Sequence, residues 1–289
     1  MSRKALLLFL SLSVIWGVPY LLIKVAVADV TPATLVCLRT AIGAALLLPV
    51  AARRGEIRAA LARWRAIVAF TIVEMGVPWL LLSDAERRLP SALSGLLIAA
   101  VPTVAAVLAA AIGHERLDPR RATGLAVGLG GVAVMLGLGA TGGTPRAFAE
   151  MALVVLGYAT APLIVSRRLA DVPQLGVVAL SLTLCALAYA PFALTELPAR
   201  MPPVAATLAI VVLGVVCTAA AFVIAFALIA EAGPVRATVV TYVNPAVAAL
   251  LGTTVLGEHF TVGMAVGFAL ILLGSFAATG RARHLQAAT

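Results

Sequence analysis

Three ionisable side chains, Lys24, Arg39 and Glu74, lie well inside long apolar stretches of this sequence. If these stretches cross a bilayer, each charge costs at least ~2.5–3.5 kcal/mol to insert, so ligand binding, proton transfer or ion pairing is the expected role. We expect Arg39 to pair with a carboxylate or with carbonyls at a helix end. Glu74 is either that carboxylate or a proton-sensitive site. Lys24 lies four residues from the end of its stretch, so it either extends to the headgroups or takes part in function.

Prolines indicate where a path through the membrane would run. A proline inside a helix frees a carbonyl and kinks the helix, and in lipid the freed group is tolerated where it is buried in protein or faces a wet cavity. Such prolines fall near the middle of five stretches, at Pro19, Pro78, Pro102, Pro162 and Pro245. Together with polar and aromatic residues nearby, they give the candidates for lining a substrate cavity. These are Trp16, Pro19, Tyr20, Glu74, Pro78, Trp79, Ser94, Tyr158, Phe222, Thr238, Tyr242 and Asn244.

Signatures of catalysis are absent from the sequence. A P-loop needs Gly-Lys-Ser/Thr, but the only lysines, Lys4 and Lys24, follow Arg3 and Ile23. The histidines lack a second ligand at zinc spacing, and the three cysteines lie one to a stretch. We therefore expect no catalytic residue, no metal and no cofactor. An integral-membrane enzyme remains the alternative from a different class.

The apolar stretches are the elements that must position these residues. The chain is 63% apolar and 11% charged, with a mean hydropathy of +1.11, which excludes an ordinary soluble domain. A bilayer core of about 30 Å needs about 20 apolar residues per helix. The sequence predicts an all-α polytopic membrane protein with ten transmembrane helices. Their expected ranges are Ala5–Ala28, Pro32–Ala52, Ala66–Ser83, Pro90–Gly113, Ala122–Gly139, Met151–Ser166, Pro173–Thr195, Pro203–Ala230, Pro234–Gly257 and Phe260–Gly280.

Lysine and arginine are distributed unevenly among the predicted loops. With the N-terminus in the cytoplasm, fifteen lie on the cytoplasmic side and four on the other, namely Arg87, Arg88, Arg146 and Arg200. This bias is the positive-inside pattern of short loops, and it predicts that both termini are cytoplasmic. The net charge of +9 therefore reflects membrane topology and contact with anionic lipid, and we expect no nucleic-acid partner.

The second half of the chain repeats the first. Pro102 and Pro245 are 143 residues apart, and a glutamate follows each of them after thirteen residues. We expect one five-helix repeat at 1–140 and a second at 145–281. Because five spans are an odd number, the second repeat is inserted in the inverted orientation. The equivalent prolines Pro102 and Pro245 are candidate hinges, with static kinks as the alternative.

Glycines at four-residue spacing mark one face of spans five and ten, at Gly124 with Gly128 and at Gly263 with Gly267. Small residues let two helix backbones approach closely. We expect spans five and ten to be scaffold, packing against each other or against their neighbours, with a dimer face as the alternative. The protein is then a monomer or a homodimer, and spans one, three, four, six, eight and nine line the cavity.

Several of these motifs resemble those of the drug/metabolite transporter superfamily, in particular its ten-helix EamA-type exporters. The similarity lies in Trp-Gly-Val-Pro at 16–19 with Lys24, in Leu-Arg at 38–39, and in the paired segments 102–115 and 245–258. The resemblance implies a carrier that exports small metabolites across the bacterial inner membrane. The sequence looks most similar to bacterial amino-acid exporters, including the aromatic ones. Span six departs from those relatives, since it has Tyr158-Ala159 where they often have Trp-Ala.

The residues themselves favour the same class of cargo. A path lined by Tyr, Trp, Thr, Ser and Asn with few fixed charges suits neutral or zwitterionic solutes. A dianion would need more than Lys24 and Arg39 offer. We predict alternating-access export of small metabolites, with amino acids as the expected substrates and other hydrophobic metabolites or drugs as the alternative.

Overall fold

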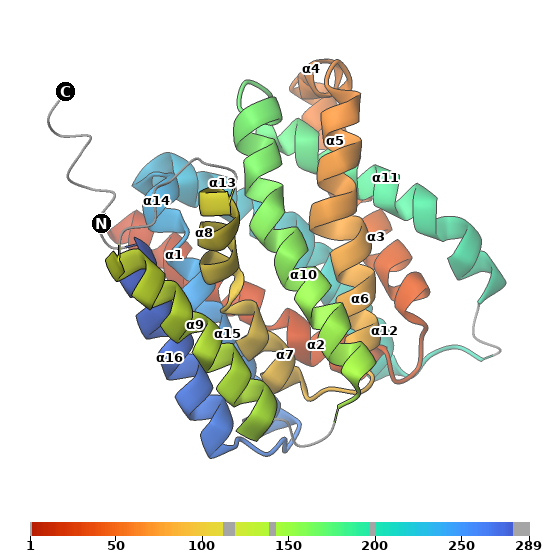
Figure 1. The fold of residues 1–289 in the computed structure, drawn as a ribbon. Coiled ribbons are helices and arrows are strands. Elements are labelled where there is room, and N and C mark those ends of the chain that lie inside the picture. The colour runs from red at the N-terminus through yellow and green to blue at the C-terminus, as the bar shows by residue number, and fades with distance from the viewer. Residues whose placement is uncertain (1, 112–118, 139–142, 197–199, 280–289) are drawn as a thin grey trace, which may run out of the picture.

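The computed structural model describes residues 2–111, 119–138, 143–196 and 200–279, and the regular structure in these ranges is helical (Figure 1). Within them, seven segments are long and apolar enough to cross a membrane. These are Arg3–Ala26, Pro32–Arg53, Trp64–Ala85, Ser91–Ala111, Pro145–Leu169, Gln174–Thr195 and Val204–Ala232. The segments that begin at Trp64 and Pro145 are each longer than the short third and sixth spans that the sequence predicts.

The segments are built from α-helices and three π-helices. In chain order they are α1 (Arg3–Gly17), α2 (Pro19–Ala26), α3 (Pro32–Arg53), α4 (Glu56–Leu61), α5 (Trp64–Phe70), η1 (Thr71–Gly76), α6 (Val77–Ala85), α7 (Ser91–Ile98), α8 (Val101–Ala111), α9 (Pro119–Leu138), α10 (Pro145–Ile164), η2 (Val165–Leu169), α11 (Gln174–Thr195), α12 (Val204–Gly214), η3 (Val215–Ala220), α13 (Ala221–Ala232), α14 (Pro234–Ala237), α15 (Val240–Val255) and α16 (Val262–Thr279). We call α1 to α9 the first half and α10 to α16 the second half. The N-terminal side is the side where α1 begins and α16 ends, and the opposite side is where α2 ends and α7 begins (Figure 1).

Most of the prolines predicted near the middle of a span lie beside a break in the α-helix or beside a π-helix. Pro19 starts α2 directly after α1, Pro78 follows π-helix η1, and Pro102 follows the break between α7 and α8. Pro162 lies inside α10, shortly before π-helix η2. At Pro245 helix α15 continues through the proline, and the break in this span lies earlier, between α14 and α15.

Helices α9 and α16 form a closely packed pair at one edge of the bundle (Figure 1). A Cβ added to Gly131 would lie 2.7 Å from the Gly267 carbonyl oxygen, and one added to Gly124 would lie 2.8 Å from the Gly274 carbonyl oxygen. Hydrogen in place of a side chain is therefore what permits this approach. Both packing alternatives that the sequence left open for these glycines are observed, since a Cβ added to Gly128 would lie 2.9 Å from Thr103 Oγ1 on α8.

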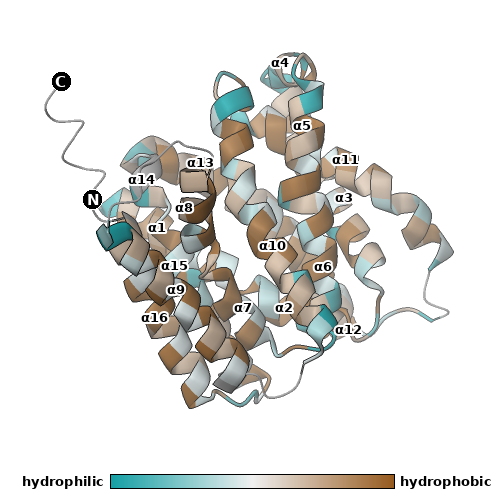
Figure 2. Ribbon diagram, viewed as in Figure 1, coloured by the Kyte–Doolittle hydropathy of each residue, from teal (hydrophilic) through white to brown (hydrophobic). Residues whose placement is uncertain are grey.

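The outer faces of the helices are apolar. Figure 2 shows hydrophobic residues along the outer sides of α9, α16 and α11, while hydrophilic residues gather near the helix ends. Leu187, Leu194 and Phe276 are each about two thirds exposed or more, at 66%, 69% and 72%. So much exposed apolar surface on a single chain is expected where lipid, rather than water, covers the helices.

Candidate functional site

Arg39 lies buried where the two halves meet. The residue is 7% exposed, and its Nε donates a hydrogen bond of 2.9 Å to Thr218 Oγ1 on π-helix η3 of the second half. Its guanidinium carbon lies 3.8 Å from the ring centroid of Trp79 on α6. A desolvated cation over an indole face is stabilised by about 2 kcal/mol. Thus a neutral hydroxyl and an aromatic face hold the guanidinium in place.

The alternative in which Glu74 is the ion-pair partner of Arg39 is wrong. Among the residues that the structure describes, no carboxylate lies within salt-bridge distance of Arg39, and Glu74 makes neither an ion pair nor a side-chain hydrogen bond. The physical reason is that Arg39 is turned toward Trp79 and Thr218. The two terminal nitrogens of Arg39 have no hydrogen-bond partner among the residues that the structure describes.

Two tyrosines lie within electrostatic range of this guanidinium. Tyr158 on α10 packs against both large hydrophobic clusters of the bundle. It interacts with Trp79 and lies within electrostatic range of both Glu74 and Arg39. Tyr20 on α2 is buried and within range of Tyr158 and Arg39. We call this set the central cluster; its members are Tyr20, Arg39, Glu74, Trp79, Tyr158 and Thr218.

A second group of aromatic residues lies between α1 and α13. The Trp16 and Phe222 rings meet edge to face with centroids 6.4 Å apart, and Phe222 stacks on Phe226 at 6.2 Å. Phe222 and Phe226 border the hydrophobic cluster that contains Trp79. The sequence candidates Trp16 and Phe222 thus come together, although Trp16 packs against a separate hydrophobic cluster between α1 and α13.

The cavity-lining candidates on and before α15 lie in different environments. Asn244 is 7% exposed, and with its amide nitrogen turned inward it donates to the carbonyls of Thr241 at 3.1 Å and Val240 at 3.2 Å. The Thr241 carbonyl is the one that Pro245 leaves without its helical donor. Asn244 therefore supplies a donor to the carbonyl that Pro245 frees, whereas Tyr242 is partly exposed and Thr238, at the break before α15, is exposed.

Three further cavity candidates, Pro19, Ser94 and Pro78, are buried at close contacts between helices. Pro19 is buried beside Gly17, where an added Cβ would lie 2.5 Å from the Val247 Cβ. Ser94 on α7 is fully buried, and its hydroxyl has no partner among the described residues. Pro78, also buried, contacts the position of Gly157 on α10. These small and kinked positions bring the helices of the two halves into close contact.

Comparison with known proteins gives the family. The model of the EamA-like transporter family matches residues 3–137 and 148–280. The chain belongs to this family. A solved structure, described only as a crystal structure of protein, is similar along 98% of this chain and 100% of its own, with 25% identity and a TM-score of 0.69. No curated protein matches the chain. Members of the family are transporters rather than enzymes, so this is a multi-pass membrane protein that carries small solutes.

Lys24 of the transporter has a role that the sequence did not predict. Its ammonium donates to the backbone carbonyls of Glu86 at 2.6 Å and Leu89 at 2.8 Å. These carbonyls follow the end of α6, where a helix presents unpaired acceptors and a negative dipole end. Lys24 therefore caps this turn and does not extend to the headgroups. A polar pocket of about 310 Å³ lies beside it, lined by Lys24, Arg88, Leu89, Pro90, Glu258 and His259.

Glu86 is a buried acid that the sequence gave no reason to single out. Its side chain is 0% exposed, and neither carboxyl oxygen has a partner among the residues described. Burial raises the pKa of the Glu86 carboxyl well above its usual range, against the opposing effect of the Lys24 ammonium. In the sequence Glu86 precedes two arginines and looks like part of an exposed charged turn.

An ion-pair network joins the two halves of the transporter on the opposite side. Asp84 Oδ2 accepts from Arg88 and from Arg146 of the second half, both at 2.7 Å. Arg146 Nε also bonds Glu150 Oε1 at 2.7 Å, and Arg88 lies 3.5 Å from Glu150. Glu150 is 6% exposed, so part of the network is shielded from water. The sequence analysis used Arg88 and Arg146 only to predict the membrane topology.

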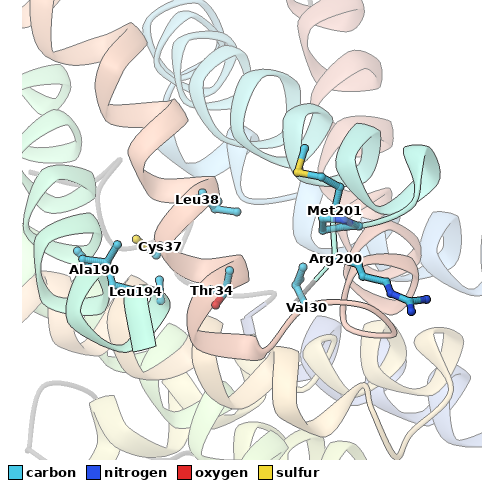
Figure 3. A pocket seen from close by; sticks show the side chains of 10 residues that line it. Val30, Thr34, Cys37, Leu38, Ala190, Leu194, Arg200 and Met201 are labelled. Atoms are coloured by element: carbon cyan, nitrogen blue, oxygen red, sulfur yellow. The ribbon is translucent and has the colours of Figure 1, made fainter. Parts of the chain in front are cut away.

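An apolar groove of about 440 Å³ lies between α3 and α11, and its lining residues are not those of the central cluster. Figure 3 shows Val30, Cys37, Leu38 and Leu194 facing it, with Arg200 and Met201 at one edge. Its lining offers few polar groups, so it does not share the chemistry of the site around Arg39.

Proposed function

We propose that this protein is a secondary transporter that exports small neutral or zwitterionic metabolites, amino acids above all, across the bacterial inner membrane. The observation that carries the proposal is the setting of Arg39. One buried guanidinium lies over the ring of Trp79, donates a hydrogen bond to Thr218 of the second half and lies within electrostatic range of Tyr158. Such a site offers a single positive charge and aromatic surface, which suits one carboxylate on a partly apolar solute.

The topology that we propose has ten membrane passes with both termini in the cytoplasm. The seven long apolar segments, together with α9, α14–α15 and α16, account for ten passes. The fifteen lysines and arginines of one set of loops and the four of the other favour the N-terminal side as the cytoplasmic one. Export then runs from the N-terminal side toward the opposite side.

Alternating access requires that contacts on one side break while those on the other form. On the opposite side the halves are joined by Arg146 with Asp84 and by Glu258 with the start of α7. The described geometry thus corresponds to closure of that side, which is the external side in the proposed topology. Opening it would separate the halves around the central cluster.

Two other readings differ in cargo and in assembly. The aromatic residues Trp16, Phe222 and Phe226 and the apolar groove at α3 and α11 favour export of other hydrophobic metabolites or drugs as the second candidate. We propose a monomer, since the glycine faces of α9 and α16 are used within the chain. A homodimer would need a different surface.

The test is transport by the purified protein alone. Proteoliposomes loaded with unlabelled amino acids are assayed for counterflow of a panel of radiolabelled amino acids, with protein-free liposomes as the control. Counterflow of one or more amino acids supports the proposal. Counterflow of amphipathic drugs but of no amino acid would favour the second candidate, and no counterflow of either would contradict both.

A further inference from the structure

Seven arginines are exposed together on the N-terminal side of the bundle. Five lie in residues 53–65, which contain α4, and two lie on π-helix η2 of the second half. Figure 2 shows hydrophilic residues at α4 and at the end of α10 on this same side. We call the seven residues the arginine patch; they are Arg53, Arg54, Arg58, Arg63, Arg65, Arg167 and Arg168.

Polar contacts between the halves hold the two parts of the arginine patch together. Arg63 Nη2 donates to Asp171 Oδ2, two residues after η2, at 2.7 Å. The N–H of Gly176 on α11 donates to Glu56 Oε2 on α4 at 3.0 Å. Helix α5 also contacts η2 directly. The arginine patch is therefore one surface to which both halves of the chain contribute.

The acids of this surface are too few to neutralise it. Glu56 and Asp171 are the acids of residues 53–65 and 165–176, so seven arginines are opposed by two carboxylates. Both carboxylates already accept hydrogen bonds within the protein, from Gly176 and from Arg63. Like charges held close together repel one another, and an anion that binds among them relieves the repulsion. The surface therefore favours an anionic partner.

Apolar side chains among the arginines indicate that this partner is a membrane. Leu61 is 53% exposed and Trp64 is 57% exposed. Trp64 also begins the apolar segment Trp64–Ala85, and the Arg65 guanidinium carbon lies 5.4 Å from its ring centroid. Tryptophan is enriched at the depth of the lipid headgroups. Arginines next to such a tryptophan lie at the level of the phosphates, where a soluble polyanion would leave Leu61 and Trp64 uncovered.

We propose that the arginine patch is a binding site for anionic phospholipid. The arginines bind the phosphates, since a guanidinium matches a phosphate with two parallel hydrogen bonds, and Leu61 and Trp64 contact the upper part of the acyl chains. Because both halves form the site, bound lipid stabilises their packing against each other. This inference goes beyond the proposed transport function and does not depend on the solute that is carried.

The test compares an anionic with a zwitterionic lipid. Purified full-length protein in a non-ionic detergent is mixed with phosphatidylglycerol or phosphatidylcholine at equal mole fractions, and Tm is measured. A ligand that binds the folded state raises Tm, so phosphatidylglycerol should raise Tm by about 4 °C or more beyond phosphatidylcholine. The difference should disappear in about 1 M salt, where the Debye length is about 3 Å. From an equal mixture, the lipid retained by the protein should be enriched about fivefold in phosphatidylglycerol.

Variants separate the arginine patch from the general charge of this side. Arg54→Gln combined with Arg58→Gln should remove most of the Tm difference and of the enrichment. Arg3→Gln combined with Arg120→Gln is the matched control, because it removes the same charge from exposed positions on α1 and α9, outside the patch. The control should keep both effects. All four side chains are exposed, and a Tm without lipid close to that of the wild type shows that each variant folds.

Three results would overturn the proposal. Equal Tm rises with the two lipids would mean that the arginine patch does not select anionic lipid. Equal losses in the patch variant and in the control would mean that total charge matters and that no site exists. Poly-L-glutamate, a soluble polyanion, is the third probe, and a Tm rise as large as that with phosphatidylglycerol would point to an acidic macromolecule instead of a membrane. Counterflow in liposomes is measured separately, so each of these results leaves the proposed transport function standing.

Discussion

The carboxylate of Glu258 caps the helix that begins at Ser91, 167 residues earlier in the chain. Glu258 Oε1 accepts from the Ser91 N–H at 2.7 Å, and Oε2 accepts from the Ala92 N–H at 2.8 Å and from the Ser91 hydroxyl at 3.1 Å. A carboxylate at a helix N-terminus satisfies unpaired donors and interacts favourably with the helix dipole. The second half thus holds the first helical turn of α7, on the opposite side of the bundle.

Removing this cap should favour opening of the opposite side. Glu258→Gln keeps the shape but loses the charge, and loss of a cap costs about 1–2 kcal/mol. A change of about 1 kcal/mol shifts a two-state population about fivefold. The reporter is Ser94→Cys, at a fully buried position of α7, in a background where the three buried cysteines are replaced by alanine. Labelling of intact cells by a membrane-impermeant maleimide should become about fivefold faster.

The matched control for this experiment is Glu231→Gln. Glu231 also joins the halves, through Ser2 at 2.7 Å and Lys4 at 3.3 Å, but it lies on the N-terminal side. This substitution should leave the labelling rate unchanged or lower it. Equal labelling of wild type and Glu258→Gln would show that the cap does not keep the opposite side closed.

The burial of the Glu86 carboxyl should make the stability of the folded protein depend on pH. Burial raises the pKa of the Glu86 carboxyl; the charges of Lys24 and Arg39 act against this and Glu258 acts with it. The folded protein then holds a proton that the unfolded chain releases. The stabilisation is therefore complete below the ordinary glutamate pKa and is lost as pH rises through the higher pKa of the folded state. Tm in detergent should fall over this range, and Glu86→Gln should reduce the fall. An unchanged profile in Glu86→Gln would contradict the prediction.

The chemistry around Arg39 shows what the sequence could and could not predict. Its depth in an apolar stretch predicted a buried charge, because such residues are costly and rare. Its partner could not be found in this way, since Thr218 is 179 residues away and no periodicity relates the two halves across their interface. Of the two roles that the sequence left open for Glu74, that of ion-pair partner of Arg39 is therefore wrong.

The fold was more accessible to sequence reasoning than the contacts between its halves. Hydropathy and proline spacing give the helices and most of their breaks, because both act locally. Contacts between the halves depend on how inverted repeats are docked. Hence Glu258 was recognised only as the end of a repeated motif, Lys24 was not recognised as a cap, and Glu86 was missed. At Pro245 the helix continues, and Asn244 supplies a local donor to the freed carbonyl, a detail that the proline spacing could not predict.

The glycine contact between α9 and α16 should be intolerant of any side chain. A Cβ at Gly131 would lie 2.7 Å from the Gly267 carbonyl oxygen, which is backbone and cannot rotate away. Gly131→Ala should therefore destabilise the protein by about 1–3 kcal/mol, as overpacking does. The neighbouring Gly130 has nothing within 4 Å of an added Cβ, so Gly130→Ala is the matched control and should have little effect. Unfolding of both variants in urea-containing detergent compares them, and equal destabilisation would contradict the prediction.

Pro102 and Pro245 occupy equivalent positions in the two repeats but differ in their local structure. Pro102 follows a real break, since α7 ends at Ile98 and α8 begins at Val101, whereas Pro245 lies in a continuous helix. Replacing either by alanine restores a helical donor without adding bulk. If both kinks bend during transport, both variants should fold and bind substrate, but they should transport more slowly. The effect should be larger for Pro102→Ala, because the restored donor can join two separate helices.

Counterflow in proteoliposomes at equal protein content measures this effect, and the Tm shift with L-phenylalanine or L-leucine measures binding. A change of about 1 kcal/mol in the conformational equilibrium alters a population about fivefold, so a decrease of that order is expected for Pro102→Ala. Pro49→Ala is the control, since Pro49 lies within the last turns of α3, away from the central cluster. Wild-type flux in both Pro102→Ala and Pro245→Ala would mean that these prolines are static kinks. Slow flux with lost binding would place their effect at the substrate site instead of at a hinge.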